Sequence, residues 1–158
     1  MLLNGSCHCG AVKFSVEAYA PVPYLRCHCS ICRKTAGGGG FAINLGAKAD
    51  TLKVEGGDAI TVFHARMDGM EGSAERRFCS KCGSALWVYD DAWPELVHPF
   101  ASAIDTPLPE PPEQVHMMLG SKASWVRDDS RPGEEKHDVY PSESLEAWHR
   151  AHGLLDDG

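Results

Sequence analysis

The sequence lacks a long hydrophobic run and an excess of basic residues. No stretch approaches the roughly 20 apolar residues that a membrane-spanning helix requires, so we expect no membrane partner. Acidic residues outnumber basic ones by 22 to 15, whereas a protein that binds a nucleic-acid backbone needs a basic face, so we expect no nucleic-acid partner. The N-terminus has neither a basic region nor a long apolar region, so we expect a cytoplasmic protein.

The composition is that of an ordinary globular domain. Of the 158 residues, 43% are hydrophobic and 23% are charged. These fractions exclude a fully disordered chain, which combines low hydrophobicity with high net charge. The length lies near the commonest domain size, so we expect a single domain over residues 1–158.

Short runs of alternating apolar and polar residues predict a mainly β fold. Val12, Phe14 and Val16 recur with a period of two, which is typical of a half-buried strand. Further strands are expected at 52–54, 59–63, 85–89 and 115–119, and the turn-type residues 55–58 join the first two of these.

Two segments of the second half differ from this pattern. Residues 106–112 are rich in proline, which predicts an extended surface strap. Residues 142–152 are the best helix candidate, because Ser142 can cap the helix and because Leu145 and Trp148 lie three residues apart.

The chain has seven cysteines, an odd number that cannot be paired completely in intramolecular disulfides. In a reducing compartment, clustered cysteines are more often metal ligands or catalytic thiols than cross-links. A CxxC knuckle brings two sulfur atoms to the separation that one tetrahedral zinc ion bridges. In a CxC strand both sulfur atoms point to one face, so the middle residues, His8 and His28, are not expected to be ligands in the same sites.

Ligand number favours a division of the seven thiols into four and three. Structural zinc is closed by four protein ligands, whereas catalytic zinc keeps one position open. A four-ligand set drawn from two distant segments would tie the first strand to a late one. The four-ligand set would be Cys7, Cys9, Cys79 and Cys82, and the three-ligand set Cys27, Cys29 and Cys32.

Spacing alone leaves other arrangements open. The two CxxC knuckles at 29–32 and 79–82 could share one zinc, although far more residues separate them than the roughly 15–20 that are usual. Alternatively, both clusters are structural, the smaller one being completed by a histidine or by water. A thiol-redox centre is disfavoured, because the βαβ context of a thioredoxin-like motif is missing.

Basic residues flank the cysteines of this acidic chain. Arg33 and Lys34 follow the three-cysteine group and are candidate contacts for an anionic substrate through charge-assisted hydrogen bonds. The other interpretation is that they offset thiolate charge. For the cations around the late CxxC motif, charge compensation is the favoured role; these are Arg76, Arg77 and Lys81.

Four segments together resemble a known family. They are Gly5–Val12, Cys27–Lys34, Arg77–Ser84 and His116–Trp125. In order, spacing and flanking residues they are similar to the glutathione-dependent formaldehyde-activating enzyme family, which also includes centromere protein V. The resemblance covers roughly residues 1–125, and its three-part cysteine signature is highly specific.

This resemblance implies a fold, a metal content and an activity. The fold is mainly β, of the β-tent type, with zinc-ribbon-like β sheets and few short helices. The activity is that of a zinc-dependent carbon–sulfur lyase-type enzyme similar to S-(hydroxymethyl)glutathione synthase, which activates glutathione for addition to formaldehyde, or catalyses the reverse. Two zinc ions per chain are implied: a structural zinc at Cys7, Cys9, Cys79 and Cys82, and a catalytic zinc at Cys27, Cys29 and Cys32.

Two other functions stay open. One is a zinc enzyme of the same fold that acts on another small molecule without a thiol. The other is a non-catalytic, zinc-stapled binding module, as the chromosomal member of the family suggests. The net acidity disfavours a chromatin role, and a family resemblance determines the fold better than the substrate.

Overall fold

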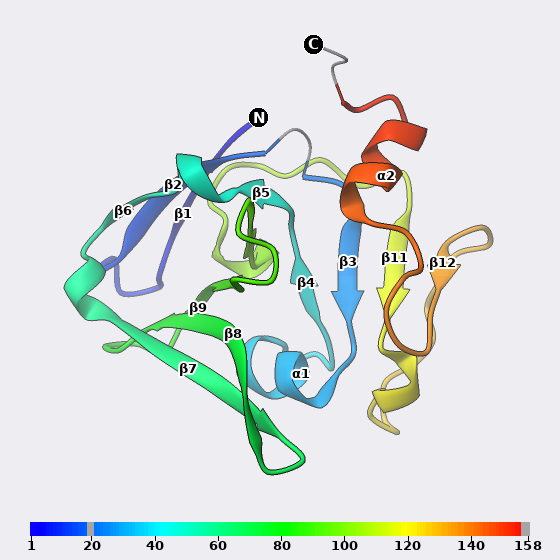
Figure 1. Ribbon diagram of the computed structural model, residues 1–158, viewed down its shortest axis with the longest axis horizontal. Helices are drawn as coiled ribbons and strands as arrows, with labels where there is room; N and C mark the ends of the chain where they lie inside the picture. Colours follow the sequence, from blue (N-terminus) through cyan, green and yellow to red (C-terminus); the bar gives the residue numbers. More distant parts are fainter. Residues whose placement is uncertain (19–20, 156–158) are drawn as a thin grey trace.

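The computed structural model describes residues 1–18 and 21–155, and short strands in three sheets dominate these parts of the chain (Figure 1). The prediction of a mainly β fold with few short helices is therefore confirmed. The two larger sheets meet near α1 (Ser30–Ala36), which lies at the lower centre of Figure 1.

The first sheet has the order β1-β2-β6, and its strands are antiparallel. The alternation predicted around β2 is confirmed, because Val12, Phe14 and Val16 are all buried. These side chains pack in the main core together with Trp87, whose ring centroid lies 5.0 Å from that of Phe14. The strands are β1 (Leu2–Ser6), β2 (Lys13–Glu17) and β6 (Lys53–Glu55).

The second sheet is antiparallel in the order β5-β10-β9-β8-β7 and includes a long hairpin of β7 and β8. Asp68 and Gly69 form its turn with φ of 51° and 78°, a left-handed conformation that suits Asp-Gly. The turn is tight, because β7 ends at Met67 and β8 begins at Met70. The strands are β5 (Ala47–Lys48), β7 (Ile60–Met67), β8 (Met70–Cys79), β9 (Ala85–Tyr89) and β10 (Leu96–Pro99).

Residues 55–58 join two strands, as expected, but these strands belong to different sheets. β6 pairs with β2 in the first sheet, whereas β7 pairs with β8 in the second. Between them lies a 3-10 turn at Gly57–Ala59, preceded by Gly56 in the left-handed region with φ of 75°. The glycines therefore redirect the chain from one sheet to the other.

The third sheet brings distant parts of the sequence together. Its order is β12-β11-β3-β4, with β3 parallel to β11 and antiparallel to β4. The pairing places Met117 beside Cys27. The strand expected at 115–119 ends at Met117, because Met118 takes a positive φ of 59°. The strands are β3 (Tyr24–Cys27), β4 (Ala42–Asn44), β11 (Gln114–Met117) and β12 (Glu135–Lys136).

The helix expected at 142–152 is present but shorter, as α2 (Leu145–Ala151). Its cap is Ser144 rather than Ser142, since the Ser144 hydroxyl accepts a hydrogen bond of 3.1 Å from the Ala147 amide. Trp148 anchors the helix in the main core with 4% exposure. In the described residues, neither α-helix has the length and apolar character needed to cross a membrane.

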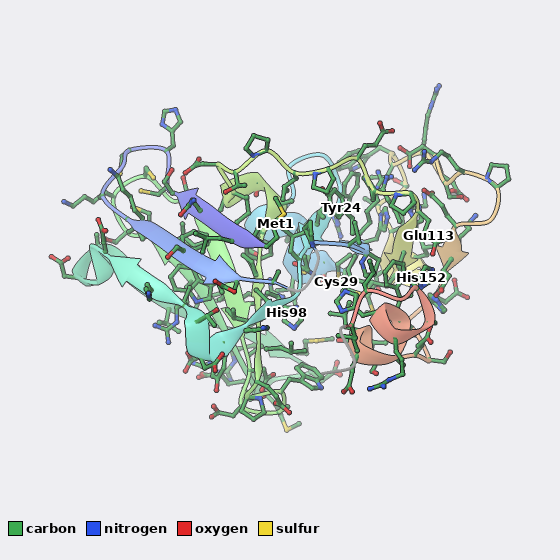
Figure 2. The ribbon with its side chains drawn as sticks, turned by 90° about the horizontal axis from the view of Figure 1, so that it is seen from above. Met1, Tyr24, Cys29, His98, Glu113 and His152 are labelled. Carbon is green, nitrogen blue, oxygen red and sulfur yellow. The ribbon has the colours of Figure 1, made fainter. Side chains whose placement is uncertain are left out.

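The Pro-rich strap expected at 106–112 has no helix or strand of its own. It is tied down where the Tyr24 hydroxyl donates a 2.5 Å hydrogen bond to the Pro109 carbonyl. Beyond the strap, His152 of α2 lies beside Glu113, with 2.9 Å between Nε2 and Oε1 (Figure 2). The strap thus connects the second sheet to the third.

Candidate metal centres

The seven cysteines form two clusters. In each cluster the Sγ atoms all lie within 4.8 Å of one another. Four thiolates around one zinc ion at about 2.3 Å would be separated by about 3.8 Å in a tetrahedron. The clusters are Cys7, Cys9, Cys79 and Cys82, and Cys27, Cys29 and Cys32. The Sγ atoms are thus grouped as four and three, and the two CxxC knuckles at 29–32 and 79–82 lie in different clusters.

The four-cysteine cluster fits a tetrahedral zinc ion closely. The Sγ atoms of Cys7 and Cys9 are 3.5 Å apart, and those of Cys9 and Cys79 are 3.8 Å apart. The cluster joins the end of β1 to the end of β8, so a bound ion would connect the first two sheets. This arrangement suits a structural site.

Two tight turns build this cluster. The Gly10 amide donates to the Cys7 carbonyl at 3.0 Å, and the Gly83 amide to the Cys79 carbonyl at 2.8 Å. Both glycines have a positive φ, 78° and 76°, which a residue with a Cβ atom adopts only at a cost. The CxC motif at Cys7 therefore lies in a turn after β1 rather than in the expected strand. His8 is exposed and is not among the grouped ligands, as predicted.

The three-cysteine cluster is built where β3 passes into α1. Cys27 is the last residue of β3, and Cys29 is the N-cap of α1, its Sγ accepting a 3.2 Å hydrogen bond from the Cys32 amide. Cys32 lies in the first turn of the helix. Among the described residues, no fourth His, Cys, Asp or Glu completes this group. A metal ion held by these three thiols alone would have a coordination position free for another ligand.

The cluster is open on one side. Cys27 and Cys32 are 3% exposed and pack against Ala42, Phe100 and Met117, whereas Cys29 is half-buried. In the view of Figure 2, Cys29 lies toward the middle of the molecule. A ligand can therefore approach from the side of Cys29.

Close packing makes the three thiols influence one another. Hydrogen bonds with Cys27 and Cys32 lower the pKa of Cys29 to about 2. The hydrogen bond with Cys29 and burial raise the pKa of Cys27 far above its ordinary value. Ionisation of one thiol in the cluster is thus favoured, and ionisation of a second or third thiol is disfavoured. A divalent cation removes this conflict, because it stabilises every thiolate that it binds.

Arg76 approaches the three-cysteine cluster from β8. Its Nη2 lies 3.5 Å from the Cys32 Sγ, and its Nη1 lies 3.4 Å from the Thr35 Oγ1. The expectation that Arg76 compensates charge at the CxxC motif of Cys79 and Cys82 is therefore wrong. Its neighbour Arg77 pairs instead with Glu75.

Tyr140 also faces this cluster, although nothing in the sequence singled it out. The Met118 amide donates a 2.7 Å hydrogen bond to the Val139 carbonyl, which holds this segment beside the end of β11. Burial and then the negative charges of Cys27, Cys29 and Cys32 raise the pKa of the Tyr140 phenol. Because Tyr140 is 68% exposed, its ring lies on the solvent side of the site.

The other flanking cations have different surroundings. Arg26 is buried, lies 3.8 Å above the ring centroid of Phe41, and forms a two-pronged ion pair with Asp129 at 2.9 and 3.3 Å. This is a structural arrangement. Arg33 and Lys34 lie in the last turn of α1, the first half-buried and the second exposed.

His28 lies between Cys27 and Cys29 but belongs to neither cluster, as predicted. Its side chain is buried, with a ring stacked 6.2 Å from that of His116. Burial and then the nearby charge of Arg26 lower its pKa. It therefore packs against the rings of Phe41 and His116 in its neutral form.

Comparison with known proteins gives concordant results. The profile of the family described as "Glutathione-dependent formaldehyde-activating enzyme" matches residues 2–132. A Halomonas elongata protein named "Putative glutathione-dependent formaldehyde-activating enzyme" is 58% identical over 154 residues, which cover 98% of each chain. The crystal structure of a Rhodobacter sphaeroides protein superposes with a TM-score of 0.53 and 29% identity, covering 67% of this chain and 91% of that one.

Proposed function

The chain belongs to the glutathione-dependent formaldehyde-activating enzyme family, and from this premise we propose that it joins a thiol to formaldehyde at the three-cysteine cluster. The thiol would be glutathione and the product its S-hydroxymethyl adduct. In the reverse direction the enzyme would act as a carbon–sulfur lyase. The name of the Halomonas elongata relative supports this substrate pair.

One observation carries the proposal: the thiols divide unequally. The four-cysteine cluster has the ligand number of a closed structural zinc site, and the three-cysteine cluster has that of a catalytic zinc site with an open position. Two zinc ions per chain are therefore proposed. All seven cysteines are free thiols, which suits a reducing compartment such as the cytoplasm.

The reaction makes one bond between sulfur and carbon. The thiol loses its proton, its sulfur attacks the carbonyl carbon, and the former carbonyl oxygen takes up a proton. A zinc ion bound by three thiolates would supply a position at which the substrate thiol ionises near neutral pH. The enzyme must also hold the thiol and the aldehyde in contact. Such positioning can supply much of an enzyme's rate acceleration.

The chain's own residues would divide this work. Cys27 and Cys32 are buried and fixed by strand and helix, so they would give the site its geometry. The half-buried Cys29 would face the reactants. Arg33 and Lys34, on the same helix as Cys32, would attract the carboxylates of glutathione.

The test is adduct formation by zinc-replete protein. Glutathione and formaldehyde combine unaided, so the rate is compared with that of the same mixture without protein and with that of a Cys29→Ser protein. Acceleration by the wild type that is absent from Cys29→Ser supports the proposal. Equal rates in all three mixtures would contradict it, and conversion of formaldehyde without a thiol would favour the thiol-independent alternative.

A further inference from the structure

Strand β8 serves both cysteine clusters. Cys79, its last residue, is fully buried in the four-cysteine cluster. Arg76 stands three residues earlier, and because side chains alternate along a strand it points to the opposite face of the sheet. On that face its cross-strand neighbour Val88 packs with Cys27 and Cys32. The strand thus connects the two clusters directly.

The guanidinium of Arg76 spans one face of α1. Nη2 contacts the Cys32 Sγ at 3.5 Å, and Nη1 donates to the Thr35 hydroxyl at 3.4 Å. The hydroxyl is oriented to accept this bond, because it donates its own proton to the Ile31 carbonyl at 2.7 Å. The side chain is therefore held by two partners on the helix.

Arg76 has no carboxylate partner among the residues that the structure describes, unlike the adjacent arginine. Arg77 forms an ion pair with Glu75 on the other face of the strand. The Arg76 guanidinium instead contacts the sulfur atom of Cys32, at 3.5 Å. Its Nε is also buried without a hydrogen-bond partner. A half-buried cation in this position would offset negative charge at the thiols.

We propose that Arg76 is a positioning residue of the three-cysteine centre, which fixes Cys32 and withdraws electron density from its thiolate. This inference rests on the proposed function, because it assumes that a metal binds there. Thiolates donate much charge and so weaken a metal as a Lewis acid, and a hydrogen bond to the sulfur reduces that donation. The four-cysteine cluster, by anchoring the end of β8, places Arg76 correctly.

The test compares three variants of zinc-stripped protein. Each receives one equivalent of Zn²⁺ for the four-cysteine cluster and then one equivalent of Co²⁺, whose sulfur-to-cobalt charge-transfer band reports on the three-cysteine cluster. Arg76→Gln is expected to shift this band to lower energy and to weaken Co²⁺ binding about tenfold. Arg76→Lys keeps the charge, so its band shift and its loss of Co²⁺ affinity should both be smaller than those of Arg76→Gln. Arg77→Gln is the matched control, and its band and its affinity should equal those of the wild type.

The outcomes separate this inference from the proposed function. If Arg76→Gln binds Co²⁺ with the band and affinity of the wild type, the inference is overturned while the enzymatic proposal stands. If Arg77→Gln changes the band as much as Arg76→Gln, the effect is one of strand integrity and the inference is again overturned. If Co²⁺ gives no band that Cys29→Ser removes, the three-cysteine site is not a metal centre and both proposals are contradicted.

Discussion

Nε2 of His116 lies 2.9 Å from Oε2 of Glu134, and both side chains are almost fully buried, with 3% and 4% exposure. His116 is on β11 immediately before Met117, which pairs with Cys27 of the three-cysteine cluster. Glu134 also accepts hydrogen bonds from the amides of Gln114 and Arg131, at 3.2 and 2.9 Å. The pair therefore fastens the segment before β12 to the sheet that carries the three-cysteine cluster.

Replacing Glu134 should make this part of the fold less stable in a pH-dependent manner. Burial opposes ionisation of Glu134, but the hydrogen bonds from His116, Arg131 and Gln114 outweigh it and hold the pKa of Glu134 at about 2. A carboxyl with a lowered pKa stabilises the fold above its ordinary pKa, and the contribution is lost as the pH falls through the folded value. We expect Glu134→Gln to reduce the free energy of unfolding by about 2 kcal/mol at pH 7.

Denaturant unfolding of both proteins from pH 7 down to pH 2 checks this. The difference in the free energy of unfolding between the wild type and Glu134→Gln should be constant above about pH 5 and should shrink below it. Metal release in acid affects both proteins alike and so cancels in the difference. A difference that stays the same at pH 3 would show that the ionised carboxylate of Glu134 does not stabilise the fold.

Single cysteine substitutions in the two clusters should have opposite consequences. Cys29→Ser is expected to remove one zinc ion and the activity while unfolding stays cooperative, because Cys27 to Cys32 span a short local segment. Cys79→Ser should lower stability by several kcal/mol, because its cluster joins the ends of β1 and β8. Zinc content by mass spectrometry and thermal unfolding measure both effects.

The reverse pattern would assign the structural role to the three-cysteine cluster. In that case Cys29→Ser would lose the cooperative transition, and Cys79→Ser would retain both fold and activity. Ser84→Ala is a suitable control near the four-cysteine cluster, because its hydroxyl contacts the Cys82 Sγ at 3.2 Å without being a ligand.

The two cysteine clusters could be predicted because the spacing of the cysteines in the sequence indicates which thiols lie together. A CxC or CxxC motif fixes the distance between two sulfur atoms whatever the rest of the fold does, and ligand number then groups the pairs. The strand at 85–89 could also be predicted, because its apolar run ends at clear turn residues. The structure has β9 at these bounds. Features of this kind depend on residues that are close in the sequence, so they can be predicted without knowledge of the tertiary structure.

The residues around the clusters could not be placed in this way. Arg76 follows Glu75 and precedes Arg77 in a run of charges, and only the register of β7, β8 and β9 decides which face each one takes. The short helix α1 was also missed, because its seven residues contain no apolar period and it depends on the N-cap at Cys29. Tyr140 reaches the site through a segment that has no strand of its own.

The proposed contacts with glutathione can be tested by removing single charges. Arg33→Gln should raise KM for glutathione about fivefold with kcat nearly unchanged, since a charge that binds reactant and transition state equally affects binding alone. Lys34→Gln should have a smaller effect, because Lys34 is exposed and its ion pair with the substrate is screened by water. Steady-state kinetics with glutathione as the varied substrate measure this.

Lys81→Gln is the matched control, since Lys81 is an exposed cation beside the four-cysteine cluster. If it raises KM as much as Arg33→Gln does, the effect reflects the overall charge of the protein, and Arg33 has no special contact. A fall in kcat at constant KM for Arg33→Gln would instead place its role after substrate binding.

Tyr140 lies close enough to the three-cysteine cluster for the charges of the thiols to raise the pKa of its phenol, and its hydroxyl is expected to donate a hydrogen bond to the reacting oxygen. Tyr140→Phe keeps the ring and removes only this donor, so kcat/KM should fall about tenfold while zinc content and stability stay unchanged. Tyr89→Phe is the control, because Tyr89 is a half-buried phenol on β9, beside Glu75 and Val97 in the sheet. Wild-type kcat/KM in Tyr140→Phe would show that the hydroxyl takes no part, and an equal loss in both variants would show that the effect is not specific to the site.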